Sequence, residues 1–594
     1  MLRRLLLSLI LLGAVASGAA YDFKVDKLCY NKNSDGKTVT VTYENSPMPS
    51  YTSLSGTVAI PANVANGGTT YAVTAIGANA FAECAAITGV TLPASLKSIG
   101  MQAFLRCTGL TAVTVPAAVT EIGRGAFWGC GALKSATLNA GLTLIDEFAF
   151  YQCTSLASIV IPTTLTTINK QAFSDCAALS KVTWNAISCA GNASISGGIF
   201  DGTTASSITS FAFGSQVTKI PDMLCDGLSK VTSITLPASL TEIGSRAFAG
   251  CYALTSIVVP NAVTKIGSGA FLACKGLKTA TIGTGVTQMG SQEFLGCDAL
   301  TAINWNAKSY PDVSSNRLSP LFALQGSGNV KITFGSSVTR IPDFLCYEAT
   351  GITSAVMPSG LKTIGYAAFY HCTGLTSAAI PSTTTSIEAL AFQGCTALTG
   401  VTIPASVVSI GTSAFTECTG LKSVAWNATN CADASGRGPF ELLSGITTFT
   451  FGNTVKHIPA YLCNGLTGLT AVTIPNSVTS IGSYAFTGCT KLTTVTLSTA
   501  LTTIGSYAFA RCYALTSIAL PATLTTIDVC GFQNCTGLKS VTVPAAMTTM
   551  GSSAFEGCTG LTSVAWNAAS CGIVASAPRL KAYQASPPSP SATL

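Results

Sequence analysis

The chain has 594 residues, too many for one ordinary globular core, and 48% of them are hydrophobic while only 9% are charged. Typical domains carry about 25% charged residues, so much of this surface must consist of Thr, Ser, Ala, Asn and Gly. The formal net charge of +7, spread over so long a chain, excludes a strongly basic surface for nucleic acid or an anionic membrane.

Residues 1–20 have the layout of a secretory signal peptide. A basic start at Arg3 and Arg4 is followed by an apolar run at 5–12 and by small residues, with cleavage expected at 18–20. The apolar run is too short to span a bilayer comfortably, and no later stretch is long and apolar enough to do so. We therefore expect an exported protein, secreted or at the cell surface, with no transmembrane span in the mature chain.

Residues 21–70 are expected to form a β-rich cap. They contain two strand-like runs joined around Asp35 and Gly36, a dipeptide typical of hairpin turns. An array of repeats needs such a cap, because its open edge would otherwise pair with other chains.

A 23-residue period dominates the chain from 71 to 571. The cysteines that mark it are Cys84, Cys107, Cys130, Cys153, Cys176, Cys251, Cys274, Cys297, Cys372, Cys395, Cys418, Cys489, Cys512, Cys535 and Cys558. The residue three positions before each of these cysteines is Phe. In the stretches between these blocks, Leu228, Ala349 and Leu466 occupy the Cys position, and Cys225, Cys346 and Cys463 occupy the Phe position.

Longer units interrupt this period at three places. They are assigned with Thr203, Gln325 and Leu443 in the Cys position, which gives 21 units from Cys84 to Cys558, with Phe in 18 of the 21 Phe positions. A larger period of 121 residues separates Trp184, Trp305 and Trp426, and Trp566 follows after 140.

Each unit contains one short strand and one tight return. In the unit that begins at Cys107, Leu110, Val113 and Val115 are expected to point inward and Thr114 outward, and Pro116 ends the strand. In the I-G-x-x-A-F segment, glycine is expected to permit the corner. Because one unit cannot bury its own apolar side, stacked units must bury each other's. The predicted fold is a β-rich (α/β) solenoid, a right-handed superhelix with short parallel strands, roughly 100 Å long at about 4.8 Å per unit.

The detailed motif IP-x-S-V-T-x-IG-x-x-AF-x-x-C-x-x-L is visible at 403–421 and 474–492. It resembles the BspA-type leucine-rich repeat family, and a 23-residue unit falls within the leucine-rich-repeat range of 20–29. The resemblance covers about 71–571. The family is found on bacterial surfaces, notably in Bacteroidetes-like organisms, and in some protists. The resemblance implies a surface or secreted role in adhesion or ligand binding, and it supplies no ligand.

The pattern stops after Cys571. The remaining segment is rich in Pro and Ser and is expected to be disordered. The predicted organisation is therefore a signal peptide at 1–20, a cap at 21–70, a leucine-rich-repeat solenoid at 71–571 and a tail at 572–594.

The 23 cysteines are interpreted mainly as buried thiols. An odd number cannot pair completely, and no C-x-x-C spacing typical of zinc sites occurs. Identical side chains stacked in register point in parallel, which fits the torsion of a disulfide poorly. The cysteines outside both core positions are the candidates for disulfides, with no pairing assigned: Cys29, Cys189, Cys431, Cys530 and Cys571.

Catalytic groups are scarce. His371 and His457 lie in separate units and are interpreted as incidental, which disfavours Ser-His or Cys-His catalysis. The 24 carboxylates form no recurring pair, and the doublet Asp146-Glu147 is interpreted as solvated. No phosphate-binding G-x-x-x-x-G-K-[ST] motif occurs. We predict no enzyme activity, no cofactor and no metal site.

Two kinds of surface remain as candidates for binding. Trp184, Trp305 and Trp426 are interpreted as core residues of enlarged units or, alternatively, as aromatic platforms for a sugar or peptide. The inserted loops that follow them, beginning at Asn185, Asn306 and Asn427, are candidates because loops often carry function.

The outward strand position carries a row of threonines. Its candidate residues are Thr91, Thr114, Thr137, Thr183, Thr235 and Thr281. Threonine suits an exposed strand, so the row needs no function. Alternatively it is a broad docking surface, since solenoids bind through their extended faces. We predict adhesion or binding of an extracellular protein or glycan, from host matrix or another cell. The alternative is a structural surface or matrix component that associates with itself.

Overall fold

The computed structural model describes residues 21–45, 50–191, 198–312, 319–322, 324, 328–434 and 436–573. It divides into unit 1, Met1–Val231, and unit 2, Thr232–Leu594, which are described separately. The predicted signal peptide and residues 574–594 of the predicted tail lie outside the described residues.

The first strands of unit 1 form a β-cap. Strands β1 (Phe23–Val25), β2 (Leu28–Lys32) and β3 (Thr38–Thr42) pair antiparallel, and β2 and β3 join at the predicted turn. Strand β5 (Asn63–Asn66) pairs antiparallel with β6 (Thr69–Ile76). Because β3 and β6 run parallel and β6 pairs with the first short strand of the repeats, the cap continues directly into the solenoid.

Tyr51 ties the cap to the first repeat. Its hydroxyl accepts a hydrogen bond from the backbone N–H of Cys29 at 2.9 Å and donates to the carbonyl of Thr42. Its ring stacks on Phe81 with 5.5 Å between ring centroids. The first buried Phe of the repeats is therefore covered on its outer side.

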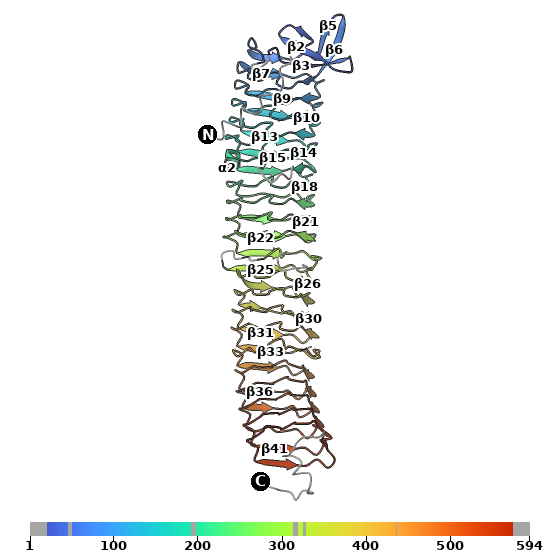
Figure 1. Ribbon diagram of the computed structural model, residues 1–594, viewed down its shortest axis with the longest axis vertical. Helices are drawn as coiled ribbons and strands as arrows, with labels where there is room; N and C mark the ends of the chain where they lie inside the picture. The colour runs from blue at the N-terminus through green and yellow to red at the C-terminus, as the bar shows by residue number, and fades with distance from the viewer. Residues whose placement is uncertain are drawn as a thin grey trace. The chain divides into compact units, whose positions relative to one another are not determined.

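Each turn of the chain in unit 1 contributes a long strand on one face and a two-residue strand on another (Figure 1). The long strands are β4 (Gly56–Ala59), β7 (Ile87–Thr91), β9 (Ala112–Val115), β11 (Ser135–Leu138), β13 (Ser158–Ile161), β15 (Lys181–Trp184) and β17 (Ser210–Phe213). The short strands are β8 (Ser98–Ile99), β10 (Glu121–Ile122), β12 (Leu144–Ile145), β14 (Thr167–Ile168), β16 (Ala190–Gly191) and β18 (Lys219–Ile220). A short helix, α2 (Thr203–Ser207), lies in the enlarged turn that follows β16.

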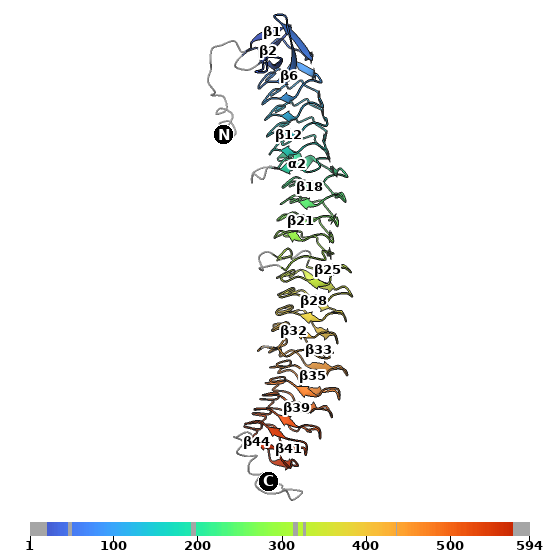
Figure 2. The ribbon, with the colours of Figure 1, turned by 90° about the vertical axis from the view of Figure 1, so that its right-hand side faces the viewer.

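Unit 2 repeats the same two ladders, and Figure 2 shows its short strands stacked along one side. Its long-strand ladder consists of β20 (Ser256–Val258), β22 (Thr279–Ile282), β24 (Ala302–Trp305), β25 (Val330–Phe334), β27 (Ile352–Val356), β29 (Ser377–Ala378), β31 (Gly400–Ile403), β33 (Ser423–Trp426), β34 (Thr448–Phe451), β36 (Ala471–Thr473), β38 (Thr494–Thr496), β41 (Ser540–Val543) and β43 (Ser563–Trp566), of which β29 has only two residues. Its short strands are β19 (Glu242–Ile243), β21 (Lys265–Ile266), β23 (Gln288–Met289), β26 (Arg340–Ile341), β28 (Thr363–Ile364), β30 (Ser386–Ile387), β32 (Ser409–Ile410), β35 (His457–Ile458), β37 (Ser480–Ile481), β39 (Thr503–Ile504), β40 (Thr526–Ile527), β42 (Thr549–Met550) and β44 (Gly572–Ile573). Neighbouring repeat strands pair in parallel, which confirms a parallel β-solenoid of about 21 turns. Strand β44 continues the ladder two residues past the predicted end at 571.

The faces of the long strands follow the predicted alternation. Leu110, Val113 and Val115 are buried, Thr114 is exposed, and β9 ends immediately before Pro116. Alternate apolar residues therefore line the interior, and the polar residues between them form the outer surface.

The Phe positions form continuous stacks inside each unit. In unit 1 the rings of Phe81, Phe104, Phe127, Phe150 and Phe173 lie 5.0 to 5.2 Å apart and within 11° of parallel. In unit 2 similar stacks run from Phe369 to Phe440 and from Phe486 to Phe555. These rings are almost fully buried, so each contributes both hydrophobic burial and ring stacking to the contact between turns.

The periodic cysteines form a second ladder beside the Phe stacks, and every cysteine except Cys571 is buried. The thiol of Cys107 donates to the carbonyl of Phe81, the Phe of the preceding turn, at 3.0 Å, and Cys130 repeats this bond to Phe104 at 3.1 Å. The same bond to a Phe carbonyl, 3.1 to 3.3 Å long, recurs from Cys153, Cys176, Cys274, Cys297, Cys395, Cys418, Cys512, Cys535 and Cys558. Cys372 and Cys489 donate instead to the carbonyls of Cys346 and Cys463, which occupy the Phe position, at 3.0 and 3.2 Å. Burial raises the pKa of Cys130 to about 12, so the thiol keeps the proton that it donates.

The corner of each turn is made differently from the prediction. The glycine of the Ile-Gly pair has no left-handed backbone, and the left-handed residues lie later, for example Phe148 (φ 58°) and Gln152 (φ 58°) on either side of Ala149 and Phe150. The glycine is needed for close approach instead. A Cβ at Gly123 would lie 2.9 Å from the backbone of the preceding turn. The expectation that this glycine supplies the corner conformation is therefore wrong.

The predicted register is also wrong by one residue in two of the three enlarged turns. Thr204, and not Thr203, is buried in the Cys position, where its hydroxyl donates to the carbonyl of Phe173 at 2.8 Å in place of a thiol. Leu321 and Leu324 are the buried residues of the next enlarged turn, and Phe322 is only half-buried. The inserted loops shift the register because their lengths need not preserve the 23-residue count. Gln325 lies outside the described residues.

Candidate binding surface

The predicted threonine row lies on the outer face of the long strands. Thr91, Thr114 and Thr137 are exposed in unit 1, while Thr183 and Thr281 are half-buried. Thr235 is exposed but lies between strands, so its placement within a strand was wrong. Thr114 and Thr137 are direct neighbours in a parallel pair.

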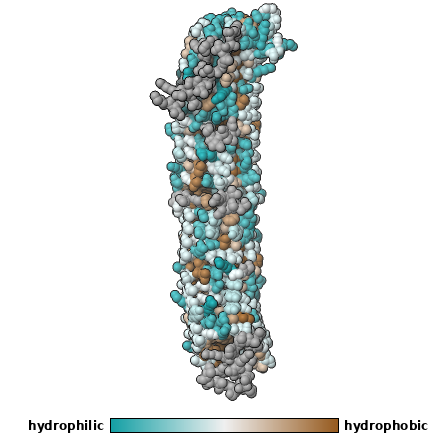
Figure 3. All heavy atoms as spheres, viewed as in Figure 1, coloured by the Kyte–Doolittle hydropathy of each residue, from teal (hydrophilic) through white to brown (hydrophobic). Residues whose placement is uncertain are grey.

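Valines interrupt the threonine row. Val160 and Val258 occupy the same outward position and are 52% and 61% exposed. The face is therefore a mixture of small neutral polar and apolar side chains, and most of it is pale on the hydropathy scale of Figure 3. Such a surface has little electrostatic preference of its own, so only shape and local hydrogen bonding could distinguish one partner from another.

A groove interrupts this face in unit 2. Strand β34 is the last of its sheet and β36 is the first of the next, and a groove of about 730 Å³ lies between them. Thr450 and Thr473 line it from the two strands, with Asn453 and Asn476 at one end and the half-buried ring of Phe451 beside them. None of the described residues that line it is charged. This groove has no signal in the periodic sequence pattern.

The three periodic tryptophans are core residues and not platforms. Trp184, Trp305 and Trp426 are 0% exposed, and each lies in register with a Phe of the next long strand, as Trp426 does with Phe451. Their indole N–H groups have no hydrogen-bond partner. Burial of an unpartnered N–H donor costs about 1–3 kcal/mol of folding free energy. The packing of the three indole rings in the core must offset this cost.

The asparagines after these tryptophans are packed between turns. Asn185, Asn306 and Asn427 are half-buried. A Cβ added at Gly452, in the next turn, would lie 2.5 Å from Oδ1 of Asn427, and the other two asparagines cover Gly214 and Gly335 in the same way. Each Trp-Asn dipeptide therefore packs against the Phe-Gly dipeptide of the following turn. This packing explains why the Trp-Asn dipeptide recurs in the sequence.

The long loops can be placed only in part. Residues 192–197 and 313–318 lie outside the described residues, so the loops predicted as contact sites cannot be followed through. The base of the second loop is fixed by Arg340, whose guanidinium bonds Asp312 at 3.0 and 3.1 Å, Asp343 at 2.7 Å and Glu388 at 2.7 Å.

Neither histidine is as isolated as the sequence suggested. His371 lies 3.3 Å from Glu417 and stacks on Tyr370. His457 forms hydrogen bonds with Ser480 at 2.7 Å and with Asp433 at 2.8 Å.

The Asp433-His457-Ser480 arrangement has the three residue types of a hydrolase triad. However, it lies along the short-strand ladder, where His457 and Ser480 pair in register, and the 2.7 Å bond from the Ala460 N–H to Asp433 gives the carboxylate a structural role. The trio therefore joins successive turns. The sequence missed it because its members are 23 and 24 residues apart.

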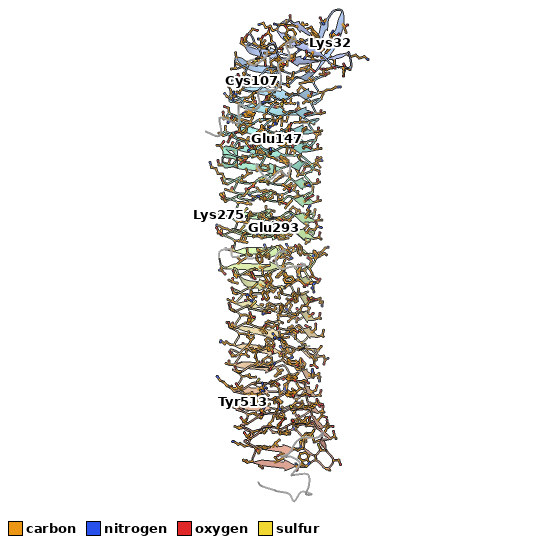
Figure 4. The ribbon with its side chains drawn as sticks, viewed as in Figure 1. Lys32, Cys107, Glu147, Lys275, Glu293 and Tyr513 are labelled. Carbon is orange, nitrogen blue, oxygen red and sulfur yellow. The ribbon has the colours of Figure 1, made fainter. Side chains whose placement is uncertain are left out.

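The carboxylate doublet is likewise engaged in contacts between turns. Glu147, labelled in Figure 4, lies 3.6 Å from both Arg124 and Lys170. Asp146 accepts a hydrogen bond from Asn169 at 2.6 Å.

Within the described part of the chain, no three His, Cys, Asp or Glu side chains are grouped so as to hold a metal ion. In the same residues, no helix is long and apolar enough to cross a membrane.

The repeat pattern corresponds to a known family. The model of the BspA type leucine rich repeat region matches residues 74–205, 193–314, 339–467 and 456–573. The chain belongs to this family. The resemblance stated from the motif is thereby confirmed.

Solved structures of other repeat proteins are similar to this chain. A leucine-rich repeat protein from Bacteroides ovatus is 21% identical over 92% of this chain and 94% of its own, with a TM-score of 0.26. A leucine rich cell surface protein from Faecalibacterium prausnitzii is 20% identical over 93% of this chain and 96% of its own, with a TM-score of 0.27. A leucine rich repeat protein of T. pallidum is 23% identical over 46% of this chain and 88% of its own, with a TM-score of 0.23. A comparison with curated proteins found no match.

Within the family pattern, aromatic residues cluster at the variable corner positions. In unit 2, Tyr461, Tyr484 and Tyr507 stack with 4.8 Å between ring centroids. In unit 1, Trp128, Phe148 and Tyr151 form a compact group. These residues lie outside the periodic core positions, although an aromatic side chain at a position that varies from turn to turn is a signal that the sequence contains.

Proposed function

We propose that this chain is an exported, non-catalytic binding protein that acts at the bacterial cell surface or after secretion. It holds an extracellular protein or glycan of the host matrix or of another cell against the outer face of its long strands. The proposal is supported by membership of a family of surface and secreted repeat proteins. It is also supported by the signal-like segment at residues 1–20.

The observation that carries the proposal is the uncharged groove between β34 and β36. A binding site is usually a concave surface with a few polar groups that fix orientation, and this groove combines hydroxyls, amides and an aromatic ring. The flat threonine face around it allows a large partner to approach. The acidic and basic side chains described above are engaged with each other or with the backbone, which favours binding over catalysis.

The test is adhesion of the purified full chain to host cells, matrix proteins and glycans. A charge placed in the groove by Thr473→Glu should reduce binding at least tenfold, because a carboxylate must then lose its hydration against neutral groups. Thr496→Glu is the matched control. Thr496 is exposed, is paired directly with Thr473, and lies outside the groove, so it should change binding less than threefold.

Two results would refute this assignment. One is equal loss of binding in the two variants, which would remove the groove from the site. The other is a chain that binds none of these surfaces and instead sediments as large self-assemblies at micromolar concentration, which is the outcome expected of a structural matrix component.

A further inference from the structure

A second hollow, in unit 1, runs across four successive turns at their corners. Its volume is about 780 Å³, and its lining includes Gly129, Gln152, Thr154, Asp175, Thr203 and Ser206. Gly129, Gln152 and Asp175 occupy the same corner position of successive turns, two residues after the stacked Phe. The hollow is therefore a groove that follows the stacking direction, with one polar group presented by each of the middle turns.

An aromatic group lies next to two of the lining residues, Gln152 and Asp175, and is hydrogen-bonded to them. The ring of Trp128 lies 5.3 Å from that of Tyr151, edge to face, and 5.8 Å from that of Phe148. All three side chains are half-buried, so part of each ring remains accessible. The guanidinium of Arg124 lies over the ring of Phe148 and forms an ion pair with Glu147. These two contacts keep the positive charge of Arg124 away from the hollow.

Hydrogen bonds connect the aromatic group to the polar lining. The indole N–H of Trp128 donates to Oε1 of Gln152 at 3.4 Å, and the hydroxyl of Tyr151 donates to Oδ2 of Asp175 at 2.9 Å. The other oxygen of Asp175 accepts from the N–H of Thr203 at 3.2 Å. The amide and the carboxylate are thus held in place before any ligand arrives, which lowers the entropy cost of binding.

The chemistry of this lining matches a sugar. A pyranose presents C–H groups on its faces and hydroxyls around its edge. The lining of the hollow supplies an amide, a carboxylate and hydroxyls, and the rings of Trp128 and Tyr151 adjoin this lining through their hydrogen bonds to Gln152 and Asp175. Among the described lining residues there is no Lys or Arg to attract a phosphate or sulfate, and Asp175 would repel one.

A peptide strand fits less well than a glycan. The corner backbone is already bonded from turn to turn, as from Gly129 N–H to the carbonyl of Tyr151 at 2.8 Å and from Gln152 N–H to that of Ser174 at 3.0 Å. Addition of a peptide strand needs unpaired backbone groups, which these bonds consume. In contrast, turns about 5 Å apart can each contact one sugar of a chain that lies along the groove.

We propose that this hollow binds a neutral oligosaccharide, whose sugar faces pack on Trp128 and Tyr151 and whose hydroxyls bond Gln152 and Asp175. This site is in a different unit from the groove at β34 and β36 and is independent of it. It gives the chain a glycan-binding activity of its own, whatever the groove binds.

The test is titration calorimetry of the purified full chain with neutral tetrasaccharides of glucose, mannose and N-acetylglucosamine, and with their sulfated counterparts. At least one neutral probe should bind, more tightly than its sulfated form. Trp128→Ala and Gln152→Ala should each weaken this binding at least tenfold. Gln152 is exposed and has no core contact to lose, so Gln152→Ala remains informative if Trp128→Ala unfolds.

Two matched controls separate this site from others. Tyr484→Ala removes a half-buried corner ring of unit 2, at the position that Phe148 occupies in its own turn, and should leave binding unchanged. Thr473→Glu, which tests the groove, should also leave it unchanged. The inference is overturned if no neutral probe binds, if the sulfated probes bind more tightly, or if Gln152→Ala binds as well as the unmodified chain. Each of these results leaves the adhesion assay of the groove to be judged by itself.

Discussion

Glu293 provides the sharpest test of how burial governs this fold. It occupies the position before Phe294 where the neighbouring turn has Ala270 before Phe271. The side chain, labelled in Figure 4, is fully buried. Its Oε2 accepts a hydrogen bond from the N–H of Ala270 at 2.9 Å, and Oε1 has no partner. Burial raises the pKa of Glu293 to about 8, although the backbone hydrogen bonds lower it in part.

The expected effect on stability follows from proton uptake. The folded chain binds a proton at Glu293 that the unfolded chain, with a pKa near 4.5, has lost at neutral pH. The stabilisation is therefore complete below about pH 4.5 and is lost as the pH rises to about 8. Between these limits the free energy of unfolding falls by about 1.4 kcal/mol per pH unit, or about 3 kcal/mol from pH 5 to pH 7. Tyr310, which faces Glu293, stays neutral there because burial raises its own pKa.

The assay is urea unfolding of Glu293→Gln, Glu293→Ala and the unmodified chain at pH 5, 6 and 7. The glutamine keeps the size and an acceptor but cannot titrate, so its stability should exceed that of the unmodified chain by an amount that grows with pH. Glu293→Ala should stabilise at pH 7, because it restores the usual residue. Parallel pH profiles for the glutamine variant and the unmodified chain would refute the reasoning.

Three further predictions concern the interior. Trp426→Phe should cost less than about 1 kcal/mol in chemical unfolding because it removes an unpartnered buried N–H, whereas Trp426→Ala should cost about 3–5 kcal/mol. Gly123→Ala should destabilise unit 1 by about 1–3 kcal/mol, as measured by local hydrogen exchange, because its Cβ meets backbone; Gly131→Ala, where the nearest atom would be 3.5 Å away, should be close to neutral. The cysteines of the ladder, such as Cys130, should react with a thiol reagent only after unfolding, since they are buried and protonated, and rapid labelling of the native chain would contradict this.

The strand faces and the core could be read from the sequence because they repeat. Leu110, Val113 and Val115 lie inward as predicted. Successive side chains of a strand point to opposite faces, so a short strand whose two ends are marked in the sequence can place its apolar residues on only one face. The interpretation of the periodic cysteines as buried thiols also agrees with the structure. The disulfide candidates were wrong for Cys29, Cys189, Cys431 and Cys530, which are buried and unpaired, and Cys571 is half-buried.

What the sequence could not supply depends on contacts between turns. Nothing local marks Gln152 as left-handed, because its conformation is set by the bond from its N–H to the carbonyl of Ser174 in the neighbouring turn. The register at Thr204 depends on the geometry of an inserted segment. Likewise His457 meets Asp433 and Ser480 only because successive turns stack in register. The candidate sites were missed for the same reason, since each is assembled from several turns.

The direction of the backbone bonds between turns has a mechanical consequence. These bonds run along the stacking direction, so tension applied in that direction loads them one turn at a time and not all together in shear. A turn that detaches releases its 23 residues, about 80 Å of extended chain, while its neighbours stay folded. A chain pulled in an optical trap should therefore lengthen in small, regular steps at low force. A chain that unfolds turn by turn in this way limits the force that it transmits from one end to the other.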